Sequence, residues 1–148
     1  MIDCTETLVE FVVPGKPQAQ GRHRTRVMQA GGRSFARMHD DPKSVSHKAT
    51  IQQHAMEAMS GRAPTMLPVA AQIRFIWAMP KSRWLKRDQR PGEAKLSKPD
   101  ADNLAKAVLD ACNGVVYVDD SQVFKLSVVK LIARQGEPAR TEVVFLVA

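Results

Sequence analysis

The sequence is poor in cysteine. Only Cys4 and Cys112 occur, far apart and without the C-x-x-C spacing of a zinc ribbon or a redox motif. Two such thiols do not form the disulfide framework of a small secreted protein either. We therefore expect two reduced thiols in a cytoplasmic protein.

Long hydrophobic runs are also missing. The acidic residues Asp3, Glu6 and Glu10 interrupt the only apolar stretch near the start, so we expect no secretory signal. The longest uncharged apolar runs are far too short to cross a bilayer. These absences argue against a secreted or membrane-spanning protein.

What the sequence does have is positive charge. Its 148 residues suit one domain, residues 1–148, with a modest core. The formal net charge is +7, so the surface carries an excess of lysine and arginine that attracts polyanions. On charge alone, a nucleic-acid-binding protein and a basic protein indifferent to nucleic acids are equal alternatives.

Apolar periodicity predicts both strands and helices. Residues 123–133 and 140–147 are expected to form an antiparallel pair around a turn at 135–138. Helices are expected at about 42–59, which opens on Pro42, and at 103–113, which Gly114 follows. The other expected strands cover residues 7–13, 25–29, 33–38, 69–79 and 115–118.

Two basic segments, 16–26 and 80–99, lack apolar periodicity and are expected to be loops. Runs of charge are usually only solvated, but two of them in a basic protein favour contacts with DNA phosphates. Trp84, inside the second segment, could stack on an unpaired base or pack against the loop, and we favour packing. The residues expected to contact DNA are Lys16, Arg22, Arg24, Arg26, Arg83, Lys86, Arg87 and Lys98.

Aspartates in two short segments suggest catalytic chemistry. Asp102 suits the N-cap or first turn of the helix, but a capping role for Asp102 does not explain the presence of Asp100. Asp119 and Asp120 follow a short apolar strand, so we expect all these acids at the mouth of one sheet–helix layer. Their mutual repulsion would be relieved by Mg²⁺, which prefers carboxylate oxygens and can activate a water beside a phosphate.

Lys106 lies one helical turn beyond Asp102 on the same polar stripe. An ordinary surface pair between them would contribute roughly 0.2–0.5 kcal/mol to stability. The functional alternative is a cation directed at a substrate phosphate beside the metal site.

The motifs Asp100-x-Asp102-Asn103-x-x-Lys106, an aspartate late in the helix (Asp110), and Asp119-Asp120-x-Gln122-Val123 resemble those of the RusA family of Holliday-junction resolvases. The resemblance is specific over about the last third of the chain. The segment from Val13 to Pro17 resembles the phage-borne branch less specifically.

The resemblance implies an α/β protein of the α+β type, with a small mixed sheet packed against two main helices, acting as a homodimer. It implies an endodeoxyribonuclease that resolves four-way DNA junctions by paired nicks in recombination and repair, in the cytoplasm of a bacterial or phage-infected cell. The cofactor would be Mg²⁺, which Mn²⁺ could replace. Asp100, Asp102 and Asp120 would be catalytic metal ligands and Lys106 a catalytic cation. Asp119 matches the first acid of the Asp119-Asp120 pair in the motif.

Two alternatives stay open at this point. One is a binding protein for branched DNA without catalysis, in which the acids are only caps and turn residues. The other is a Mg²⁺-dependent nuclease for flaps or forks.

Overall fold

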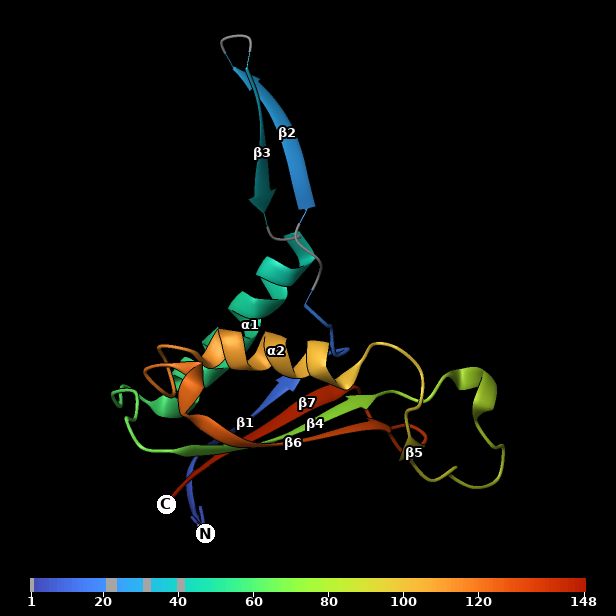
Figure 1. Cartoon of the computed structure of the whole chain (residues 1–148). Helices are drawn as coiled ribbons and strands as arrows, with labels where there is room; N and C mark the ends of the chain where they lie inside the picture. The colour runs from blue at the N-terminus through green and yellow to red at the C-terminus, as the bar shows by residue number, and fades with distance from the viewer. Residues whose placement is uncertain (1, 21–23, 31–32, 40–41) are drawn as a thin grey trace.

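The computed structural model describes residues 2–20, 24–30, 33–39 and 42–148, and for 24–30 and 33–39 it describes the backbone alone. Its centre is a five-stranded sheet in the order β1-β7-β4-β6-β5, covered on one face by helices α1 and α2 (Figure 1). A separate two-stranded ribbon is formed by β2 and β3. The elements are β1 (Glu6–Pro14), β2 (Arg24–Ala30), β3 (Arg33–His39), α1 (Pro42–Met59), β4 (Val69–Trp77), the 3-10 turn η1 (Lys81–Arg83), β5 (Glu93–Ala94), α2 (Ala101–Cys112), the 3-10 turn η2 (Asp120–Gln122), β6 (Val123–Ile132) and β7 (Arg140–Val147).

The core lies between the sheet and the two helices. In β7, every second residue is buried, as expected for a strand with one face on the core. The central strand β4 is buried at all positions except Gln72 and Arg74. Trp77 is buried, as the sequence predicted. The α+β fold with a mixed sheet and two helices is confirmed.

The expected pairing of the last two strands is wrong. β4 lies between β6 and β7, pairing parallel to β6 and antiparallel to β7. A parallel pair needs a crossover connection, and α2 supplies it between β4 and β6. The apolar residues of β6 and β7 fitted a hairpin equally well, because local patterns do not specify the neighbour of a strand.

The expected strand at 115–118 is also not formed. The segment is a turn in which Tyr117 makes only isolated bridges, to Thr65 and Asn113. Its apolar residues Val116 and Tyr117 are buried under the end of α2, so their hydrophobicity serves the core. Gly114 has φ +80, which agrees with its expected place after the end of the helix.

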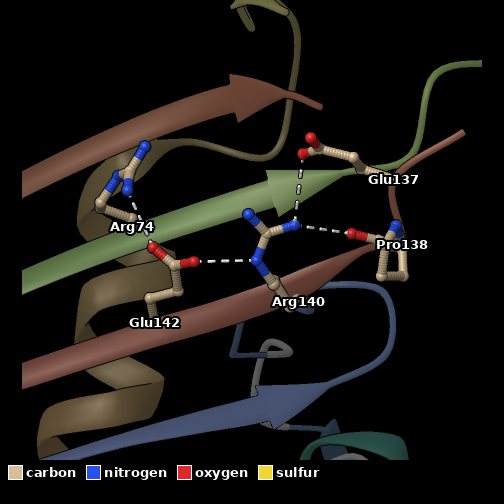
Figure 2. Close-up of polar contacts among 5 residues, drawn as sticks. All are labelled: Arg74, Glu137, Pro138, Arg140 and Glu142. Carbon is tan, nitrogen blue, oxygen red and sulfur yellow. Dashed lines mark hydrogen bonds and ion pairs between the residues drawn. The ribbon is translucent and has the colours of Figure 1, made fainter. Parts of the chain in front are cut away.

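The sheet face opposite the helices carries an ion-pair network (Figure 2). Glu142 of β7 accepts hydrogen bonds from Arg74 of β4 at 2.9 Å and from Arg140 at 2.8 Å. Arg140 also donates to the Pro138 carbonyl and lies 3.9 Å from Glu137. These partly exposed pairs cover the strands with charge and are expected to add little stability.

The segment from Pro80 to Pro99 is more ordered than the sequence suggested. It contains η1 and β5, and the buried amide of Gln135 accepts hydrogen bonds from the Leu85 and Arg90 N–H groups and donates one to the Leu85 carbonyl. The indole N–H of Trp84 donates to the Met79 carbonyl at 3.1 Å, while 42% of the residue stays exposed. Gln135 lies some 45 residues away in sequence, which is why local reading missed its role.

None of the helices in the described part of the chain is long and apolar enough to cross a membrane.

Candidate active site and DNA-binding surface

The N-terminal end of α2 presents two exposed carboxylates. Asp100 is the N-cap, with extended backbone at φ −72 and ψ 146, and its carbonyl accepts the Leu104 N–H at 3.2 Å. Asp102 lies in the first turn, so the cap position falls two residues earlier than Asp102. The Asp100 carboxylate makes no capping hydrogen bond, and among the described residues neither acid has a hydrogen-bond or ion-pair partner. Both are therefore available to an external ligand, in the field of the helix N-terminus.

Lys106 is exposed one turn further along α2. Within the part of the chain that the structure describes, it forms no ion pair with Asp102 or any other acid. The ordinary surface pair considered for these two residues is therefore absent. An ammonium group without an internal partner can bind an external anion, because no ion pair within the described chain has to be broken first.

The acids beyond the other end of α2 are held differently from one another. The Ser121 hydroxyl donates a short hydrogen bond to the Asp119 carboxylate. That bond is the main cause of a lowered pKa for Asp119, with further donation from the Ser121 N–H, the Asn113 side chain and the Asp120 N–H. Asp120 is exposed, and its carboxylate has no hydrogen-bond partner among the described residues.

Gln122 fixes this turn to the body. Its amide N–H₂ donates to the Thr65 and Leu67 carbonyls at 2.8 and 3.0 Å, and its oxygen accepts the Asp119 N–H at 2.8 Å. The Asp120 position is thus tied to the segment that leads into β4.

Tyr117 fixes the same region to the core and to helix α2. It is fully buried, and its hydroxyl donates to the Leu109 carbonyl at 2.6 Å. Burial raises its pKa far above the ordinary value, and the nearby acidic groups of Cys112, Asp120, Asp110 and Asp119 raise it further. The phenol therefore stays neutral and keeps donating its hydrogen bond.

A single chain does not bring the three predicted ligands together. Lys130, near the end of β6, donates to the Ser97 and Pro99 carbonyls, which places the start of α2 at that end of the sheet. Gln122 places Asp120 at the opposite end, beside the start of β4. The twelve residues of α2 span about 18 Å. Accordingly, no three His, Cys, Asp or Glu residues in the described ranges are grouped to hold a metal ion.

A positively charged cleft lies beside the first acid pair, and a second cleft shares one lysine with it. One, of about 450 Å³, is lined by Lys16, Lys95 and Lys98 together with Pro99, the residue before Asp100. A second, of about 660 Å³, shares Lys16 and adds Lys43 at the start of α1. Lys95 and Lys130 were not among the residues singled out from sequence, because only the folded sheet places them beside α2.

One arginine of the second basic segment, Arg83, already has an acidic partner. Arg83 forms an ion pair with Glu93 at 2.6 Å, which raises the pKa of Arg83 and lowers that of Glu93. Lys86 and Arg87 are exposed.

The first basic segment is described only in part. Arg22 and His23 lie outside the described residues, and Arg24 and Arg26 belong to the ribbon strand β2.

Comparison with known proteins places this acid-bearing, basic α+β domain among the endodeoxyribonucleases. Residues 14–144 match the family described as Endodeoxyribonuclease RusA, and the chain belongs to that family. A relative in Bacillus subtilis (strain 168), the uncharacterized protein YqaN, is 35% identical over 141 residues, which cover 90% of this chain and 92% of the relative. The resemblance seen in the motifs is therefore confirmed over most of the chain.

Proposed function

We propose that the protein is a Mg²⁺-dependent endonuclease that resolves four-way DNA junctions by paired nicks. The observation that carries this proposal is the pair of exposed, unpartnered carboxylates at the start of α2, beside the lysine-lined cleft. Membership of an endodeoxyribonuclease family supports the reaction type. The net charge of +7 supports a nucleic-acid substrate.

The donor set suits a hard divalent cation. Asp100 and Asp102 offer carboxylate oxygens that make no competing hydrogen bond within the described chain. When bound, Mg²⁺ supplies a water of lowered pKa and offsets charge on the phosphate, and Mn²⁺ would serve the same role. Asp120 is the third ligand in this proposal.

A second copy of the chain would supply Asp120 to the site. Asp120 lies at the start of β6, whereas Asp100 and Asp102 lie over its end. If two copies pair β6 antiparallel about a twofold axis, the start of one β6 lies beside the end of the other. Each site would then combine Asp100 and Asp102 of one copy with Asp120 of its partner, and the two sites would act on opposing strands of the junction.

The free edge of β6 supports this homodimer. β5 pairs only with Leu131 and Ile132, so residues 123–129 have no strand on that side in the described chain. Phe124 and Leu126 are 48% and 45% exposed there. An open, apolar edge strand is typical of a surface that pairs with another chain.

The remaining residues would act on the DNA itself. Lys106 would bind the phosphate that is cut, because it lies on the Asp102 side of α2 without an internal partner. Lys16 and Lys98 would hold neighbouring phosphates along the cleft. Arg24, Arg26, Lys86 and Arg87 would extend the contact, whereas Arg83, already paired with Glu93, would contribute less.

The test is cleavage of a synthetic four-way junction with Mg²⁺ by wild type and by Asp120→Asn. We expect paired nicks from wild type, and junction binding with nicking reduced on the order of 10³-fold in the variant. Asp119→Asn is the matched control and should nick far more than Asp120→Asn. If wild type binds but cuts no branched DNA, the proposal is wrong and the non-catalytic alternative holds. Cutting confined to flaps or forks would replace the junction as substrate.

A further inference from the structure

The ribbon formed by β2 and β3 has an unequal distribution of charge between its two faces. The strands pair antiparallel, with Arg24 opposite His39, Arg26 opposite Arg37, and Ala30 opposite Arg33. Residues directly opposite each other share a face, and so do residues two apart on one strand. All four arginines and the histidine of the two strands therefore occupy one face. The other face consists of Thr25, Val27, Gln29, Ser34, Ala36 and Met38, without any charge.

This arrangement is unfavourable for the ribbon alone. Like charges directly opposite each other, as at Arg26 and Arg37, destabilise a strand pair. A two-stranded ribbon is also only marginally stable by itself, and this one does not join the five-stranded sheet (Figure 1). A polyanion on the arginine face would remove the repulsion and stabilise the ribbon.

The dimensions of the ribbon fit duplex DNA. Each strand has seven residues and extends about 24 Å. Arginines two residues apart on one strand, such as Arg24 and Arg26, are spaced about 6.8 Å, which equals a rise of two base pairs of about 3.4 Å each along the helix axis of DNA.

The position of the ribbon in the chain connects it to the candidate site. Its second strand leads into α1, whose Lys43 lines one basic cleft together with Lys16. Lys16 also lines the cleft with Lys98, beside Asp100. A positively charged path thus leads from the candidate catalytic acids towards the ribbon.

We propose that the arginine face of the β2–β3 ribbon binds a duplex DNA arm away from the nicked strand, adding affinity but not catalysis. The inference rests on the proposed function for its location on the junction, but it is tested on DNA binding alone. Because the contact is with backbone phosphates, it is independent of base sequence.

The experiment measures the affinity of the full-length protein for a fluorescent 20-base-pair duplex, without divalent metal, over a series of salt concentrations. One variant is R26Q/R37Q, which removes one opposing pair. The matched control is T25R/R26T/A36R/R37A, which keeps net charge and composition but moves two arginines to the other face. A third variant, R24K/R26K/R37K, keeps the charge in place and tests that the ribbon tolerates substitution. Circular dichroism checks each fold.

We expect R26Q/R37Q to weaken binding at least tenfold at about 0.1 M salt and to reduce the log–log salt slope by about 1.8. The face-exchanged control should weaken binding to a similar degree, and the lysine variant should stay within about threefold of wild type. Wild-type affinity in the face-exchanged control would overturn the one-face proposal, since only net charge would then matter. Wild-type affinity in R26Q/R37Q would remove the ribbon from DNA binding. Neither result depends on nicking, so a failure of the proposed nuclease activity is seen separately.

Discussion

The aspartates at the first end of helix α2 differ from Asp119, one of the two aspartates beyond its second end. At the first end, Asp100 and Asp102 are exposed and have no hydrogen-bond partner among the described residues. Beyond the second end, Asp119 accepts hydrogen bonds from Ser121, Asn113 and nearby backbone N–H groups. Asp120, its neighbour, resembles the first pair in having none.

The difference separates structural carboxylates from candidate ligands. A carboxylate that is already surrounded by donors loses those bonds when it binds a cation, whereas an unpartnered one loses only water. Asp119 holds its turn, and Asp100, Asp102 and Asp120 are available. The contrast supports the choice of Asp120 over Asp119, and it can be tested by changing the two ends separately or together.

The largest expected effect comes from mixing two inactive variants. If each site combines acids from two copies, an Asp102→Asn and Asp120→Asn heterodimer has one fully mutated site and one intact site. Equal co-refolded mixtures should then recover about a quarter of wild-type nicking, although each variant alone is inactive. Failure to recover activity in heterodimers isolated with two affinity tags would show that the two ends do not meet across a dimer.

Replacing the cation at the first end should have the next largest effect. We expect Lys106→Ala to slow nicking on the order of 10²-fold, because the variant lacks the positive charge that would stabilise the phosphate in the transition state. The melting temperature should not change, since Lys106 makes no ion pair within the described chain. Lys48→Ala, an exposed lysine on α1, is the control for loss of one positive charge and should nick normally. Equal rates for the two variants would contradict the assigned role.

A change at the second end should lower the stability of the fold. Gln122→Ala removes the donors to the Thr65 and Leu67 carbonyls, and we expect the free energy of unfolding to fall by about 1–3 kcal/mol. Denaturant unfolding measures it. Gln53→Ala is the control, because that exposed amide contacts only Glu57 on the same helix, and it should cost less than about 0.5 kcal/mol. Similar losses in both would mean that the turn is not anchored through Gln122.

The smallest expected effect is a change in the titration of Asp119. Ser121→Ala removes its main hydrogen bond, so the pKa of Asp119 should rise towards the ordinary range in an NMR titration. Because the folded-state pKa of Asp119 is lowered, its contribution to stability exists above the unfolded pKa and is lost as pH falls. The variant should therefore lose less stability than wild type on acidification. An unchanged pKa would mean that Asn113 and the backbone suffice.

Much of the local structure followed from the sequence. The helix opened by Pro42 and the strand at 140–147 have the expected bounds, since proline placement and period-two alternation act locally. The strand expected at 115–118 was wrong, because a short apolar run fits a buried turn as well as a strand. Its burial depends on Thr65 and α2, which are distant in sequence.

The three aspartates were predicted as metal ligands from their spacing and from the family motifs, and this stays a prediction. The match over residues 14–144 confirms the family. Local sequence was sufficient to predict the residue types, the helix phase of Asp102 and Lys106, and the basic character of the chain, because these depend on composition and neighbouring residues alone. The folded structure was needed to show that Asp120 lies at the opposite end of α2 and that Lys130 and the lysine cleft flank Asp100. The cause is the parallel β4–α2–β6 crossover, which sends the helix back along the sheet and separates residues that motif spacing places side by side.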